Sequence, residues 1–183
     1  MYPKVVVSNG SPPTYFMFEN NNMLKTTLLL NSIPTYTVTT NLHGSITELR
    51  TAGRNTLVGR IRRNKICPNT ITFPTVNGGR SMRLGGWFKR IRLADGSPAV
   101  VIKTEVGICF LRTHSVYRLA LFSEDLQFMI AHWQPHTDPS SPITLVLLVA
   151  ATETFCAQII AAFLLEEQTM RKRVGGGPGG DCS

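Results

Sequence analysis

The sequence predicts a mainly β fold in which a closed antiparallel barrel encloses one hydrophobic C-terminal helix. Two observations support this prediction: about eleven short extended runs separated by turn residues, and one apolar helix after them. A closed barrel has no free sheet edges but must have a filled interior, and a helix without a polar face would fill it. The 183 residues, 43% hydrophobic and 16% charged, suffice for one globular core and are too apolar for disorder.

The ordered part is expected to begin with the aromatic and apolar residues of Tyr15–Phe18. Apolar and polar residues alternate in Tyr36–Thr39 and Val58–Arg62, which predicts strands with one face toward water. Turn residues such as Asn, Asp, Gly and Pro separate the extended runs. The runs are Thr26–Leu30, Thr35–Thr40, Ser45–Leu49, Leu57–Arg62, Thr70–Phe73, Trp87–Leu93, Ala99–Thr104, Gly107–Arg112, Val116–Phe122, Gln127–Trp133 and Ile143–Val149.

The C-terminal helix is expected over about residues 152–173, with Thr152 as its N-cap. Its apolar residues recur at a spacing of four in two series, so most of its circumference is apolar. Such a helix is buried inside a protein or inside a membrane, and we favour the first. A tail anchor stays open because the stretch Ile143–Leu165 is long enough to span a bilayer, although Glu153 would be costly there.

One domain is expected over residues 15–173, between a flexible lead (1–14) and a disordered glycine-rich tail (174–183). The N-terminal region has no apolar run long enough for a signal peptide. The four cysteines include no CxxC pair, which suits a reducing compartment, and Cys109 and Cys156 have the apolar neighbours of core thiols. We expect a cytoplasmic protein, with peripheral attachment to membranes as a further option.

Several short motifs connect the chain to a known family. They are Lys25–Leu28, Tyr36–Thr40, Arg60–Arg62, Asp95-Gly96, Ile130–Trp133, and the hydrophobic helix that runs into Glu166 and Arg171–Arg173. In these motifs the chain, from about Phe16 to Arg173, resembles the fungal family called domain of unknown function 6593. That family belongs to the wider group with the tubby C-terminal fold, alongside LURP-one-related proteins and phospholipid scramblases. The resemblance implies a barrel of about twelve strands threaded by the C-terminal helix, in a family without an established activity.

Basic residues dominate one segment of a chain whose net charge is +8. From Arg50 to Arg92 there is no acid, and the basic residues are Arg50, Arg54, Arg60, Arg62, Arg63, Lys65, Arg80, Arg83, Lys89, Arg90 and Arg92. The guanidinium fork of arginine matches phosphate, and each cation near an anionic membrane contributes about 1 kcal/mol. The candidate residues for binding an anionic headgroup are Arg60, Arg62, Arg63, Lys65, Arg83, Lys89, Arg90 and Arg92. The alternative is a solvated face that binds nothing.

Catalytic constellations are poor in this sequence. His132 and His136 have the spacing of a metal pair on a helix, but Pro135 between them argues against a helix. His132, beside Trp133, is instead expected to be a strand residue. No nucleophile elbow and no paired carboxylates occur. We therefore expect no catalytic residue, metal or cofactor, and no enzyme. Nucleic acid is not expected either, because neither a recognition helix nor an RNA-binding aromatic pattern is evident.

Two main function classes remain. The first is a non-enzymatic module that binds anionic phospholipid headgroups, and the tubby resemblance suggests phosphoinositides. The second is a protein-interaction scaffold with an unknown partner and no lipid ligand. A tail-anchored membrane protein is the third and weaker alternative.

Overall fold

The computed structural model describes residues 12–134 and 141–175, which form one antiparallel sheet of 13 strands and a long C-terminal helix. The strands are β1 (Thr14–Phe18), β2 (Lys25–Leu30), β3 (Ile33–Thr40), β4 (Ile46–Thr51), β5 (Leu57–Arg62), β6 (Thr70–Thr72), β7 (Met82–Arg83), β8 (Phe88–Arg92), β9 (Pro98–Thr104), β10 (Gly107–His114), β11 (Arg118–Ser123), β12 (Met129–Trp133) and β13 (Thr144–Leu147). The helices are the 3-10 turn η1 (Asn77–Gly79), α1 (Leu84–Trp87) and α2 (Glu153–Gly175). The prediction of a mainly β fold is confirmed.

Each predicted extended run contains a strand, in the predicted order. Trp87 is the informative exception, because it was expected to begin a strand and instead ends α1. Its ring is buried and packs against Phe73 with the ring centroids 5.3 Å apart. The two-residue strand β7 was not predicted, and Thr14, expected in the lead, already belongs to β1. Residues 1–11 of the expected lead and 176–183 of the expected tail lie outside the described residues.

The predicted closure of the barrel is not supported. The strands are hydrogen-bonded in the linear order β7-β6-β5-β4-β3-β2-β1-β13-β12-β11-β10-β9-β8, so β7 and β8 are the two edges. No ladder joins these edges in the part of the chain that the structure describes. A tight hairpin could have paired them, but the chain passes from β7 to β8 through the four-residue helix α1. We call this gap the seam, and Trp87 of α1 enters the core beside it.

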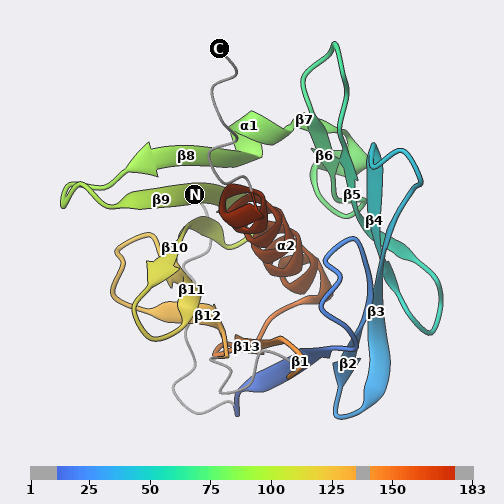
Figure 1. Ribbon diagram of the computed structural model, residues 1–183, viewed down its shortest axis with the longest axis horizontal. Coiled ribbons are helices and arrows are strands. Elements are labelled where there is room, and N and C mark those ends of the chain that lie inside the picture. Colours follow the sequence, from blue (N-terminus) through green and yellow to red (C-terminus); the bar gives the residue numbers. More distant parts are fainter. Residues whose placement is uncertain (1–11, 135–140, 176–183) are drawn as a thin grey trace, which may run out of the picture.

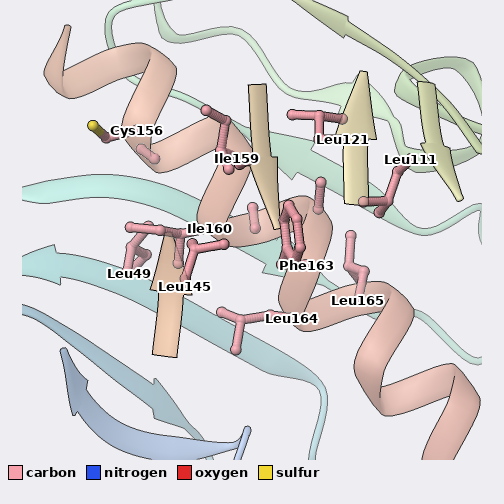
Figure 2. Close-up of a cluster of buried hydrophobic side chains, with 14 of the residues drawn as sticks. Leu49, Leu111, Leu121, Leu145, Cys156, Ile159, Ile160, Phe163, Leu164 and Leu165 are labelled. Carbon is pink, nitrogen blue, oxygen red and sulfur yellow. The ribbon is translucent and has the colours of Figure 1, made fainter. Parts of the chain in front are cut away.

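Helix α2 lies inside the curve of the sheet, as Figure 1 shows. Its first turn is capped as predicted, because the backbone N–H of Phe155 donates to Thr152 Oγ1 at 3.1 Å. Every residue from Phe155 to Glu167 is buried. Figure 2 shows Leu49, Leu111, Leu121 and Leu145 of the surrounding strands directed toward one stretch of the helix. The predicted buried helix is therefore confirmed, and no helix among the described residues is long and apolar enough to cross a membrane.

We expect Phe163→Ala to lower the free energy of unfolding by about 3–5 kcal/mol, because it leaves a large cavity between helix and sheet. The Phe163 ring is fully buried and packs edge-on against Trp133 at 5.0 Å. Urea denaturation followed by tryptophan fluorescence measures the change. Leu42→Ala is the control, since the Leu42 side chain is fully exposed and should matter by less than about 0.5 kcal/mol. Equal stability of Phe163→Ala and wild type would contradict a packed interior.

Candidate functional site

The structure separates the eight candidate basic residues instead of gathering them on one face. Ile61 points into the core, so its neighbours Arg60 and Arg62 lie on the outer face of β5. Arg62 pairs in register with Thr70, which pairs with Arg83, so Arg62 and Arg83 share this outer face. Arg60 is neutralised there by Glu48, whose oxygen lies 2.7 Å away.

Three further candidates lie elsewhere, two on the sheet and one in a loop. Lys89 is exposed on β8, and it alternates with Phe88 and Arg90, whose side chains lie on the other face. Arg92 donates to the carbonyl of Gly96 at 3.1 Å within its own hairpin. Lys65 is exposed in the loop between β5 and β6. These positions offer scattered cations, not a single basic surface.

Arg63 and Arg90 meet at the C-terminal end of α2. Together with Lys172 of the helix they line a hollow of about 450 Å³ beside the seam. A second hollow of about 860 Å³ adjoins it and is lined by Lys25, Arg171 and, again, Arg63 and Lys172. We call these two hollows, where the last turns of α2 leave the sheet, the α2 mouth.

Arg63 holds the centre of the α2 mouth. Its guanidinium donates to Thr47 Oγ1 at 2.7 Å, to Gln168 Oε1 at 2.8 Å and to the Gly44 carbonyl at 3.4 Å. All three acceptors are neutral, so no acid compensates its charge among the described contacts. The guanidinium is half-buried, and this burial lowers the pKa of Arg63 from its usual value. The result is a half-buried positive charge that lines both hollows.

Two buried acids on α2 are held by arginines from the sheet. Arg90 of β8 donates two hydrogen bonds to the carboxylate of Glu166, at 3.0 and 2.6 Å. Glu167 is 1% exposed and accepts from Arg118 of β11 at 2.9 Å and from Arg171 at 2.8 Å. Arginines from β8, from β11 and from the position directly after β5 thus hold one turn of the helix. We call the pairs of Glu166, Glu167 and Gln168 with Arg90, Arg118 and Arg63 the arginine collar.

The lysines of the α2 mouth differ from its arginines. Lys25 and Lys172 are exposed, and neither has a hydrogen-bond or ion-pair partner among the described residues. Both can therefore bind an external anion without breaking an internal contact. Sequence reasoning missed them as site residues. Lys25 stands alone in its surroundings, and Lys172 belongs to a basic triplet that the negative end of the helix dipole already explains.

The described histidines and cysteines do not form a metal-binding or catalytic cluster. Nowhere in residues 12–134 and 141–175 do three or more metal-ligating side chains gather. His132 is a strand residue as predicted; its Nδ1 lies 3.0 Å from the Trp133 carbonyl, and burial lowers its pKa. His136 lies outside the described residues. Cys109 and Cys156 are buried core thiols, as predicted, and burial raises the pKa of each to about 11.

In a Cys182→Ser variant of the folded protein, we expect one thiol to react rapidly with Ellman's reagent at pH 8. Cys67 is exposed, whereas Cys109 and Cys156 are shielded and remain protonated thiols far below a pKa of about 11. Two more thiols should react after denaturation. Rapid reaction of all three in the folded state would contradict the burial of α2.

Comparison with known proteins supports the fold and identifies the family. The X-ray structure of a protein from Arabidopsis thaliana, AT5G01750, is similar, with a TM-score of 0.56 over 87% of this chain and 92% of that chain. At 11% sequence identity this likeness shows a shared fold and nothing more. No curated protein matches the chain. The profile of the Family of unknown function (DUF6593) matches residues 21–172, and the chain belongs to this family.

Proposed function

We propose that this protein is a non-enzymatic module that binds anionic phospholipid headgroups, phosphoinositides among them, at the α2 mouth. The observation that carries the proposal is Arg63, a half-buried cation that lines both hollows and whose partners among the described residues are all neutral. A bound anion stabilises such a charge, and the electrostatic attraction between them is stronger than at a fully exposed site because less water screens it. A cytoplasmic location with peripheral attachment to membranes is part of the proposal.

The α2 mouth offers two kinds of donor to a phosphate. Lys25 and Lys172 are unpaired among the described residues and can bind directly as point charges. Arg63 adds a fixed positive field between them. Glu166 and the negative end of the α2 dipole would repel a phosphate. Lys172 and Arg173 in the last turn of the helix offset the dipole.

This proposal assigns a direct role to only some of the eight basic residues that the sequence suggested as headgroup ligands. Arg63, Lys65 and Arg90 belong to the α2 mouth or to a loop beside it. Arg62, Arg83 and Lys89 would contribute only to the general attraction between the protein and an anionic surface, which salt screens strongly. Arg60 and Arg92 are already engaged within the protein.

We also propose that the fold is a tubby-like one of fungal origin, as the family resemblance implied. The support is architectural: one antiparallel sheet curves around a hydrophobic C-terminal helix. The seam between β7 and β8 replaces the hydrogen-bonded closure that a complete barrel would have.

A protein-interaction scaffold is the second candidate. It is favoured by the unpaired edges of β7 and β8, because an extended peptide can add a strand to an open sheet edge. This candidate needs no lipid.

The first test is co-sedimentation with liposomes of phosphatidylcholine alone or with a few per cent of phosphoinositide, at two salt concentrations. We expect salt-sensitive binding to the anionic liposomes only. The double variant Lys25→Glu, Lys172→Glu should weaken it at least about tenfold, since each cation contributes about 1 kcal/mol and each reversal adds repulsion.

Lys103→Glu is the matched control. Lys103 is an exposed lysine on β9, near Glu105 and therefore at the N-terminal end of α2, where Glu105 contacts Thr152. Its reversal should leave most of the binding intact. Absence of binding at low salt would contradict the lipid proposal and leave the scaffold. An equal loss for Lys103→Glu would show that net charge, not the α2 mouth, attracts the liposomes.

A further inference from the structure

Exposed aliphatic side chains occur at the end of the sheet where α2 finishes. Leu42, in the loop between β3 and β4, is 103% exposed, and Ile66, in the loop between β5 and β6, is 98% exposed. Leu24, in the loop between β1 and β2, is 44% exposed. Single exposed apolar residues are ordinary on proteins. Here three alternate loops of one antiparallel sheet each present one, and alternate loops lie at the same end.

All three loops border the α2 mouth. Leu24 itself lines the larger hollow. Gly44, in the same loop as Leu42, lines that hollow and accepts a hydrogen bond from Arg63. Asn69, in the same loop as Ile66, lines the smaller hollow. The apolar tips therefore surround the proposed site instead of lying apart from it.

Two of these aliphatic residues stand directly beside a lysine. Leu24 precedes Lys25, and Ile66 follows Lys65. Both lysines are exposed, and neither has a partner among the described residues. At a membrane the aliphatic side chain can enter the boundary of the acyl chains, while the lysine next to it keeps its charge among the headgroups.

We infer that the loops of Leu24, Leu42 and Ile66 insert into the bilayer and orient the protein with the C-terminal end of α2 toward the membrane. This inference rests on the proposed function and names its binding surface as an anionic bilayer rather than a free headgroup. The charge of the neighbouring lysines selects the anionic surface. A protein interface would instead centre on a contiguous patch enriched in aromatic residues, and none of the three tips is aromatic.

The loop between β10 and β11 extends the same surface on the other half of the sheet. Val116 is exposed in that loop. It lies two residues before Arg118, which holds Glu167 of α2. Ile33 offers a control position at the opposite end of the sheet. Its side chain is 66% exposed, and it lies next to Pro34, which lines a pocket together with Glu153 at the start of α2.

Cys67 provides a native probe in the loop of Ile66, because its thiol is exposed. In the full chain with Cys182→Ser, Cys67 is labelled with the fluorophore NBD, and vesicles of phosphatidylcholine, phosphatidylserine and a few per cent of phosphoinositide are added. We expect a blue shift and a rise in emission as the probe leaves water. The control carries Cys67→Ser, Cys182→Ser and Ile33→Cys, and its label should not respond.

Co-sedimentation of the same samples separates the possible failures. Binding with a response at Cys67 alone supports the insertion. Binding without a response at Cys67, or with a response at Ile33→Cys, overturns the insertion and leaves the lipid module intact. Absence of binding overturns both the proposed function and this inference.

Substitutions test the same surface without a probe. We expect Leu42→Ser together with Ile66→Ser to weaken binding to the anionic vesicles about tenfold, because two inserted apolar side chains are lost. Thermal unfolding should be unchanged, since both side chains are fully exposed. Ile33→Ser should bind as wild type does. Unchanged binding of the double variant would overturn the inference.

Discussion

An apolar helix without a polar face must be covered on every side, and this requirement shapes the rest of the structure. Every residue of α2 from Phe155 to Glu167 is buried, and a flat sheet would cover only one side of this stretch. The chain meets the requirement by curving one sheet around the helix (Figure 1). At the seam no ladder of hydrogen bonds joins the described strands β7 and β8. There α1 contributes the buried ring of Trp87, which packs into the core.

The same helix creates the charged site where its apolar stretch ends. Glu166 and Glu167 are still buried and Gln168 is half-buried, and the arginine collar binds them through guanidinium groups from β8, from β11 and from the position directly after β5. Holding α2 thus requires arginines at the opening of the sheet. The three hydrogen-bond partners of Arg63 are neutral, so no acid compensates its positive charge among the described residues. The packing of the core and the proposed binding of anions therefore involve the same residues.

The site was only partly predictable from the sequence. The basic segment was evident, but the side chains of neighbouring residues in it point in different directions. Arg62 lies on the outer face of β5, whereas Arg63 points toward α2. The two lysines could not be connected from the sequence, because Lys25 and Lys172 are far apart in the chain and line one hollow only because α2 lies inside the curve of the sheet. The exposed residues Leu42 and Ile66 carried no signal at all, because an apolar residue in a loop is ambiguous until its exposure is known.

The sequence by itself determined where most strands lie along the chain, the buried helix with its Thr152 cap, and the core thiols, because these follow from local periodicity and composition. Only the tertiary structure decided three other features: the seam between β7 and β8, the division of the basic residues, and the position of the loops around the α2 mouth. The physical reason is that strand register and sheet curvature arise from contacts between distant residues. A shift of one residue in register exchanges the inner and outer faces of a strand, and local sequence does not set that register.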